Sequence, residues 1–217
     1  MKPKGKVKIR WSSEFAYAIG LLVTDGNLSP DKRHINFTSK DYELVELFKR
    51  AFGLENKIGR KSREYSKEKK YFVVQFGDVQ FYNFLLKIGL MPNKSKIIGE
   101  LAIPRKYFSD FLRGHLDGDG TFHSYFDHRW KSSYMFYTIF MSASKKQIDW
   151  LREKIDVRIG VFGHVTKSKN SSVYQLKFAK AESLKLLSKL YYNSKVMCLS
   201  RKRNKIEKAP AVEGRKL

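Results

Sequence analysis

Two aspartates in matched settings are the residues of this chain best suited to chemistry. Asp25 and Asp119 lie 94 positions apart, and each is followed by glycine at the end of an apolar stretch, YAIGLLVTDG at 17–26 and FLRGHLDGDG at 111–120. A carboxylate in the last turn of a helix faces the negative end of the helix dipole, which costs about 0.3–1 kcal/mol. We therefore expect a hard divalent cation, Mg²⁺ or Mn²⁺, beside these aspartates, a setting that suits phosphodiester hydrolysis.

The Asp-Gly pair also has an ordinary use as a turn from helix to strand. That alternative is the stronger one for either copy taken alone. The two copies, however, share further residues at the same 94-residue spacing: Gly20 with Gly114, and Leu22 with Leu116. The matched set favours a repeated site over two unrelated turns.

Two helices must position the aspartates. Residues four apart lie on the same face of a helix, and small residues at that spacing allow two helix backbones to touch. The matched faces carry Ala16, Gly20 and Thr24 in the first helix and Asp110, Gly114 and Gly118 in the second. We expect these helices to pack against each other, which would bring the two carboxylates close together with the cation between them.

The paired motifs resemble those of the LAGLIDADG homing endonucleases, in the form that carries two motifs on one chain, and the resemblance covers nearly the whole sequence. The second copy, LRGHLDGDG, follows the family pattern closely, whereas the first has Val23 where the family often has an acid. The resemblance implies that Asp25 and Asp119 are catalytic metal ligands. It also implies backbone carbonyls at Thr24 and Gly118 as further ligands.

The resemblance further implies basic residues that order water and contact the scissile phosphates. We expect this role for four lysines: Lys40, Lys94, Lys145 and Lys202. Lys40 follows Ser39, at a position where the family often has glutamine, and Ser144 precedes Lys145 in the similar pair of the second half. Lys94 matches a lysine of the family's connector. For the segment around Lys202, a basic tail that touches phosphates without catalysis, or a nuclear-localisation-like cluster, remains the alternative.

Hydrophobic periodicity predicts the same order of elements in each half of the chain: helix, two strands, helix, two strands, helix. The fold class is therefore α+β, with two pseudo-symmetric αββαββα repeats packed through the motif helices. The expected boundaries are residues 1–93 for the first repeat, 94–104 for a connector, and 105–217 for the second repeat with a basic C-terminal tail. The resemblance implies that two antiparallel sheets form a saddle over DNA.

Polar side chains alternate with apolar ones along the expected strands and should face away from the core. Antiparallel ribbons with such faces can lie in the major groove of DNA and reach base edges. We expect the following side chains to bind DNA: His34, Asn36, Thr38, Arg63, Gln75, Gln175 and Lys177. For each one alone, the alternative is a solvated strand face.

Composition limits the partners. Lys and Arg number 44 against 21 Asp and Glu, a net charge of +23, which points to a polyanion and above all to double-stranded DNA. No basic amphipathic helix, lipid signal or membrane-spanning stretch supports a membrane partner. The single cysteine, Cys198, excludes an internal disulfide and fits a reducing intracellular compartment, either cytoplasm with nucleoid or an organelle matrix. We expect no small-molecule cofactor.

The sequence therefore predicts a site-specific DNA endonuclease of the intron-homing type. It would hydrolyse both strands of a long, imperfectly palindromic target with a divalent metal, leave staggered ends, and act as a monomer because both motifs lie on one chain. One alternative is an RNA maturase of the same fold. Another is a non-cleaving DNA-binding regulator, which would be expected to have lost the two acids and gained a helix-turn-helix; neither feature is seen in the sequence.

Overall fold

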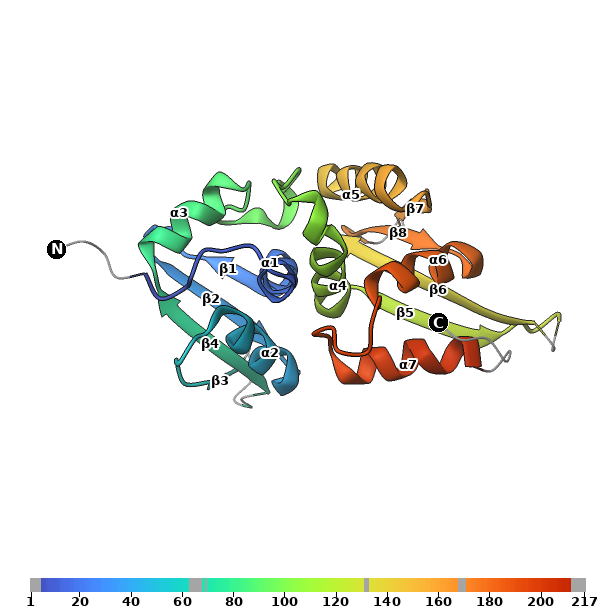
Figure 1. The fold of residues 1–217 in the computed structure, drawn as a ribbon, viewed down its shortest axis with the longest axis horizontal. Coiled ribbons are helices and arrows are strands. Elements are labelled where there is room, and N and C mark those ends of the chain that lie inside the picture. Colours follow the sequence, from blue (N-terminus) through green and yellow to red (C-terminus); the bar gives the residue numbers. More distant parts are fainter. Residues whose placement is uncertain (1–4, 63–67, 69, 131–132, 168–170, 212–217) are drawn as a thin grey trace. The chain divides into compact units, whose positions relative to one another are not determined.

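The computed structural model of the protein describes residues 5–62, 68, 70–130, 133–167 and 171–211. The first half contains α1 (Ser13–Asp25), β1 (Gly26–Leu28), β2 (His34–Ser39), α2 (Tyr42–Phe52), β3 (Gly59–Lys61), β4 (Tyr71–Gly77) and α3 (Val79–Lys87). The second half contains α4 (Phe108–Gly118), β5 (Thr121–Phe126), β6 (Tyr134–Ser142), α5 (Lys145–Ile159), β7 (His164–Lys167), β8 (Tyr174–Phe178) and α6 (Lys180–Leu190). This repeated order confirms the predicted αββαββα plan (Figure 1).

The connector and the C-terminal segment add smaller elements. Two 3-10 turns, η1 (Lys94–Lys96) and η2 (Arg105–Tyr107), lie between the halves. The segment expected to be a basic tail contains a further helix, α7 (Ser200–Ala211), which contacts β5. Within the described residues, no helix is both long and apolar enough to cross a membrane.

The chain divides into two compact units. The first comprises Met1–Lys94 with Leu101–Gly118, and the second comprises Ser95–Glu100 with Asp119–Leu217. Helix α4 therefore packs within the first unit, although it opens the second run of elements. The boundaries expected for the two repeats, after residues 93 and 104, concern the repetition of elements rather than compactness, and they stay a prediction.

Each unit contains a four-stranded antiparallel sheet, with strand order β1-β2-β4-β3 in the first and β5-β6-β8-β7 in the second. In the first sheet Ile35 pairs with Phe76 and Phe37 with Val74, and all four side chains are buried on the face covered by helices. Phe37 also stacks on Phe48 of α2 at 4.4 Å between ring centroids. The alternation predicted for β2 and β4 is thereby confirmed.

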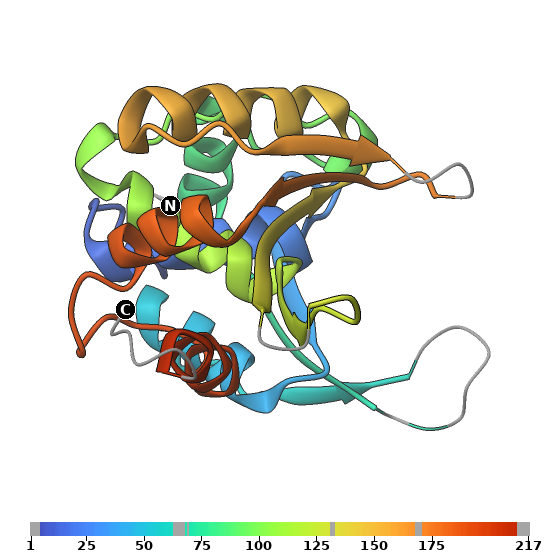
Figure 2. The same ribbon diagram turned by 90° about the vertical axis from the view of Figure 1, so that its right-hand side faces the viewer.

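The second sheet follows the same plan. Helices α5 and α6 contact β6 and β8 and cover one face of the sheet (Figure 2). Five apolar side chains on that face are buried: Phe122, Phe136, Phe140, Leu176 and Phe178. The core of this unit thus also lies between a sheet and its helices.

The closest packing in the first unit is between α1 and α4, whose backbones touch at two glycines. A Cβ atom on Gly20 would lie 2.2 Å from the carbonyl oxygen of Phe111, and one on Gly114 would lie 2.0 Å from the carbonyl oxygen of Tyr17. Because Phe111 is the residue 94 positions after Tyr17, the two contacts are symmetric equivalents. The predicted packing of the motif helices through small residues is confirmed.

Because the backbones touch at Gly20, a single methyl group added there should lower the stability of the protein. Gly20→Ala should lower the free energy of unfolding by about 1–3 kcal/mol or more, because the added Cβ overlaps backbone atoms that cannot move independently. Urea denaturation followed by circular dichroism measures the change. Gly99→Ala is the matched control, since its Cβ would lie 3.7 Å from Lys146 Cβ in ordinary contact. Equal stability of the two variants would contradict the assignment of close backbone contact.

Candidate functional site

The C-terminal ends of α1 and α4 meet at Gly118. A Cβ atom there would lie 1.9 Å from Thr24 Oγ1 and 3.1 Å from Asp25 Oδ2, so the backbone of Gly118 lies directly against both residues. The Thr24 hydroxyl donates to the carbonyl of Leu21 at 2.9 Å and is 3.4 Å from Asp25 Oδ2. The helix pair therefore brings together three of the predicted metal-site residues, and Asp119 follows Gly118 in the chain.

Two lysines outside the motif helices make the same contact in the two units. Lys94, only 8% exposed, donates from Nζ to the carbonyl of Gly26, and Lys202 donates from Nζ to the carbonyl of Gly120 at 2.7 Å. Gly26 and Gly120 are the residues that follow Asp25 and Asp119. Each Asp-Gly step therefore has an ammonium group on its backbone, where a cation offsets the negative end of a helix. The two lysine contacts are thus equivalent within the repeat, and the catalytic role expected for Lys94 and Lys202 stays a prediction.

The other two predicted lysines are exposed and lie in different settings. Lys40 lies over the ring of Tyr71, with Nζ 5.4 Å from the ring centroid. Lys145 is the first residue of α5 and forms an ion pair with Asp149 at 2.6 Å. The structure does not give these two lysines a common contact.

The sequence similarity pairs Ser39-Lys40 of the first half with Ser144-Lys145 of the second, but the hydrogen bonds of the two turns pair different residues. The Ser39 hydroxyl accepts from the backbone N–H two residues later, at 3.1 Å, just before α2. In the second unit the residue that makes this contact is Ser142, which accepts from the N–H of Ser144 at 3.1 Å. Ser144 itself is buried, and its hydroxyl donates to the carbonyl of Ile98. Ser142, and not Ser144, is therefore the counterpart of Ser39. The counterpart of Lys40 is then Ala143, two residues before Lys145.

The donor set at the Asp-Gly steps consists of oxygen atoms. The first step has the Asp25 carboxylate and the Thr24 carbonyl, and the second has the Asp119 carboxylate and the Gly118 carbonyl. Over the described parts of the chain, no group of three or more His, Cys, Asp or Glu side chains is arranged to hold a metal. Mg²⁺ is usually bound by one or two carboxylates together with water and substrate phosphate, whereas structural zinc needs a closed cage of nitrogen and sulfur ligands. The residues present therefore fit a hard cation whose shell is completed by solvent and phosphate.

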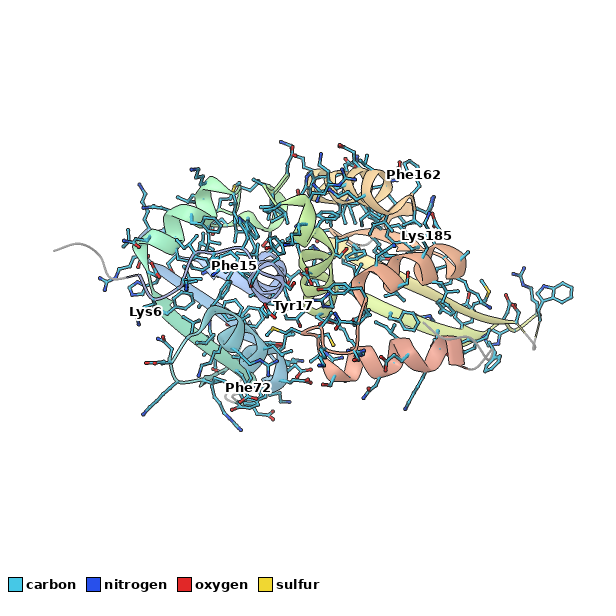
Figure 3. All side chains as sticks on the ribbon, viewed as in Figure 1. Lys6, Phe15, Tyr17, Phe72, Phe162 and Lys185 are labelled. Atoms are coloured by element: carbon cyan, nitrogen blue, oxygen red, sulfur yellow. The ribbon has the colours of Figure 1, made fainter. Side chains whose placement is uncertain are left out.

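A buried polar network surrounds the crossing of α1 and α4. The hydroxyl of Tyr17 donates to Asp117 Oδ2 at 2.7 Å, and Tyr17 is labelled in Figure 3. The guanidinium of Arg113 lies 5.6 Å from the centroid of the Tyr17 ring. Arg113 is fully buried and pairs with Asp110 at 2.7 Å. Sequence reasoning named Asp110 only as a face residue and did not single out Tyr17. The network joins the two motif helices by polar contacts as well as by their glycines.

The predicted DNA-binding residues of the first sheet share its outward face. Asn36 pairs in register with Gln75, and His34 and Thr38 lie two positions to either side of Asn36 on β2. The His34 ring also contacts Asp31, and hydrogen bonds from the backbone and the side chain of His34 lower the pKa of Asp31 to about 2. Arg63 lies outside the described residues.

The second sheet presents Gln175 and Lys177 on its outward face. Gln175 lies opposite Met141 of β6 and Thr166 of β7, and Lys177 lies opposite Ile139 and His164. The sequence predicts the strand at β6 but assigns no function to its outward residues, because YMFYTIFMS is mostly apolar on both faces.

Neither sheet carries a negative charge on its strands. No Asp or Glu occurs in β1 to β8 as the structure describes them. The same strands carry these basic or titratable side chains: His34, Arg60, Lys61, His123, His164, Lys167 and Lys177. The strands of both sheets therefore contribute only neutral or positive side chains, as a phosphate-bearing partner favours.

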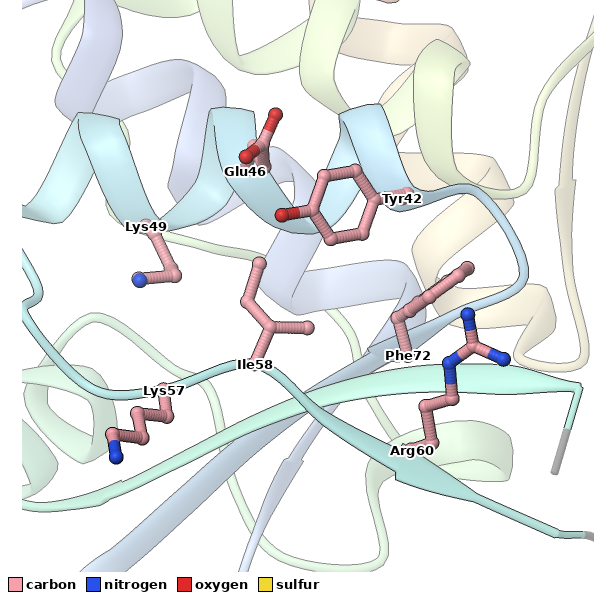
Figure 4. A pocket seen from close by; sticks show the side chains of 7 residues that line it. All are labelled: Tyr42, Glu46, Lys49, Lys57, Ile58, Arg60 and Phe72. Atoms are coloured by element: carbon pink, nitrogen blue, oxygen red, sulfur yellow. The ribbon is translucent and has the colours of Figure 1, made fainter.

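A cavity of about 430 Å³ in the first unit lies apart from these residues (Figure 4). It is lined by Tyr42, Glu46, Lys49, Lys57, Ile58, Arg60 and Phe72. A hydrogen bond with Glu46 raises the pKa of Tyr42. Since the cavity lies between α2 and the helix-covered side of β3 and β4, it is on the opposite face from Asn36 and Gln75. None of the predicted site residues lines it.

Comparisons with known proteins agree with this architecture. Residues 12–89 match the family model of a LAGLIDADG-like domain. The LAGLIDADG meganuclease I-AabMI, solved bound to uncleaved DNA, is 13% identical with a TM-score of 0.61 over 94% of this chain and 91% of that chain. The I-LtrWI LAGLIDADG homing endonuclease, solved bound to target DNA, is 12% identical with a TM-score of 0.59 over 88% and 87%.

A third solved structure widens the comparison. Full-length DUF199/WhiA from Thermatoga maritima is 14% identical with a TM-score of 0.55 over 97% of this chain and 64% of that chain. A search of curated proteins by sequence gives no match. At identities this low, structural likeness establishes a shared fold. The resemblance inferred from the two motifs is thereby confirmed.

The buried hydrogen bond between Tyr17 and Asp117 can be tested by a double-mutant cycle. The matching positions in the other copy hold Phe111 and Val23, so Tyr17→Phe and Asp117→Val introduce residue types that the opposite side already uses. Tyr17→Phe should cost about 1.5–3 kcal/mol of stability, because a bond to a carboxylate is lost. The double variant should lose less than the sum of the single losses in urea denaturation. Strict additivity would show that the two side chains do not interact.

Proposed function

We propose, on the premise that this chain has the LAGLIDADG fold with a LAGLIDADG-like domain at residues 12–89, that it is a site-specific DNA endonuclease of the homing type. The observation that carries the proposal is the repeated pairing of an Asp-Gly step with a lysine. Lys94 contacts Gly26 after Asp25, and Lys202 contacts Gly120. A fold kept only for binding DNA has no need of two such steps.

The substrate is double-stranded DNA, and both sheets contribute to its recognition. Support comes from the net charge of +23 and from strands without acidic residues. The outward row of Asn36 and Gln75 offers amide groups, which can bond bidentately to adenine edges in the major groove. Because both Asp-Gly steps are on one chain, the active form is a monomer on a long, imperfectly palindromic site.

Hydrolysis requires that water attacks phosphorus, that a bridging P–O bond breaks, and that the charge that develops on the phosphate is neutralised. The carboxylates of Asp25 and Asp119, with the carbonyls of Thr24 and Gly118, would hold a divalent cation. Mg²⁺ or Mn²⁺, when bound, lowers the pKa of water and stabilises the leaving oxygen. Lys94 and Lys202 fix the Asp-Gly backbone and add positive charge there. Lys40 and Lys145, which are exposed, contact phosphates or order water.

Two other functions of this fold stay as alternatives. A DNA-binding regulator would use the sheets without cleavage, and the shared fold of DUF199/WhiA is the observation that keeps this possibility open. An RNA maturase would use the same positive surfaces for structured RNA. Both predict that the protein binds nucleic acid and that the Asp-Gly steps are dispensable, so a cleavage assay separates them from the endonuclease.

Replacement of the aspartates tests the proposal. Asp25→Asn and Asp119→Asn each remove a negative ligand while keeping its size, so cutting of both strands in Mg²⁺ should fall below detection. Binding in Ca²⁺ should be retained, because the sheets are unchanged. The measurement is a cleavage assay beside a gel shift, on a target selected from random duplexes by sequencing of cut ends.

The outcomes of that experiment are distinct. Full double-strand cutting by Asp119→Asn would refute the site assignment. Binding without any cutting by the unmodified protein would favour the regulator, and preferential binding of intron RNA would favour the maturase. Loss of binding together with cutting would return the aspartates to a structural role.

The symmetric lysine contacts generate a separate prediction. Lys94→Met and Lys202→Met should each slow single-turnover cleavage by about 10²–10³, the range for a group that stabilises transition-state charge. Affinity in Ca²⁺ should change much less than the rate. Lys87→Met, on the exposed side of α3, is the matched control and should cut at the normal rate. A normal rate for both test variants would mean that the lysines only support the backbone.

A further inference from the structure

The equivalent strands β2 and β6 present chemically opposite outward faces. Each is the second strand in its sheet: β2 lies between β1 and β4, and β6 lies between β5 and β8. The outward residues of β2 are His34, Asn36 and Thr38, all of which can form hydrogen bonds. The outward residues of β6 are Met135, Tyr137, Ile139 and Met141. We call these four residues the β6 row.

The β6 row is not part of the core. The residues that alternate with it, including Phe136 and Phe140, are fully buried beneath the helices, whereas every member of the row is partly exposed. Tyr137 stacks on Tyr125 of β5 with ring centroids 6.4 Å apart. A hydrogen bond with the Tyr137 side chain raises the pKa of Tyr125, so the two hydroxyls are engaged with each other. A continuous, partly exposed apolar row on the uncovered face of a sheet is a candidate binding surface.

Its surroundings indicate which partner covers it. Ile139 lies between Thr121 of β5 and Lys177 of β8, and Lys177 in turn lies opposite His164 of β7. The apolar row is thus flanked by polar and basic side chains, and no strand of the sheet carries an acid. A second copy of this chain, with its charge of +23, would be repelled from such a surface. A polyanion that also offers apolar groups fits it.

The major groove of DNA offers one such group. The C5-methyl of thymine is the apolar feature of the base edges in that groove, and side chains without hydrogen-bonding groups contact it. We propose that the β6 row recognises thymine methyl groups in the half-site bound by the second sheet, whereas β2 reads its half-site through hydrogen bonds. Ile139, the inner member of the row that has no hydrogen-bonding group, is the main specificity residue. The inference rests on the proposed function, because it takes the bound polymer to be duplex DNA.

Single-atom changes in the DNA test this inference on the unmodified protein. The selected target is resynthesised with one thymine at a time replaced by deoxyuridine, which removes only the methyl group, and affinity is measured in Ca²⁺. Each contacted methyl should contribute about fourfold to Kd, equivalent to the ~0.8 kcal/mol of one buried methyl-sized group. The sensitive thymines should cluster in one half-site.

Two variants assign the effect to the strand. Ile139→Ala should abolish the deoxyuridine penalty at one or two positions and leave the other penalties intact. Asn36→Ala, the matched control on β2, should keep every deoxyuridine penalty and relax base preference in the other half-site. Circular dichroism verifies that both variants are folded.

The failures can be told apart. If the protein binds its target but no deoxyuridine substitution weakens binding, the methyl-reading proposal is wrong and the proposed function stands. If penalties occur but persist unchanged in Ile139→Ala and in Met141→Ala, the β6 row is not the reader. If no duplex is bound or cut at all, the proposed function fails and this inference fails with it.

Discussion

The contact between the backbones of α1 and α4 is the constraint on which the rest of the first unit depends. Gly20 and Gly114 let the helices approach until carbonyl oxygens lie where side chains would otherwise be. This approach places Gly118 against Thr24 and Asp25, so the same packing that holds the helices together also builds the candidate metal site. Close packing is costly to disturb in a core that cannot relax. The backbone contacts that stabilise the helix pair therefore also determine the geometry of the candidate metal site.

Much of this could be predicted from the sequence, because periodicity and repetition are local signals. The 94-residue spacing identified both Asp-Gly steps and the glycines that pack the helices, and alternation identified the outward faces of β2, β4 and β8. The resemblance to a two-motif family supplied Lys94, and its counterpart Lys202 was placed from the repeat. Their matching contacts with Gly26 and Gly120 agree with that pairing.

Other features depend on contacts between residues far apart in sequence and could not be predicted. The register error at Ser144 arose because the two Ser-Lys pairs look alike in sequence, whereas the match is decided by a turn hydrogen bond that the Ser142 hydroxyl accepts from the N–H of Ser144. The segment of helix α7 was expected to be a basic tail because its many charged residues obscure a weak apolar face in the sequence. The hydrogen bond from Tyr17 to Asp117 joins residues 100 positions apart. The β6 row was overlooked because apolar outward residues look like core until the sheet's covered face is known.

The separation between the helix pair and the outward strand faces has a consequence for evolvability. A side chain added at Gly20 or Gly114 collides with backbone atoms of the other helix, so substitutions at these two positions are poorly tolerated. A change at Asn36, Gln75 or Ile139 alters only a side chain that supports no core contact on the covered face. Substitutions on the outward strand faces can therefore accumulate one side chain at a time while the packing of the helix pair stays unchanged.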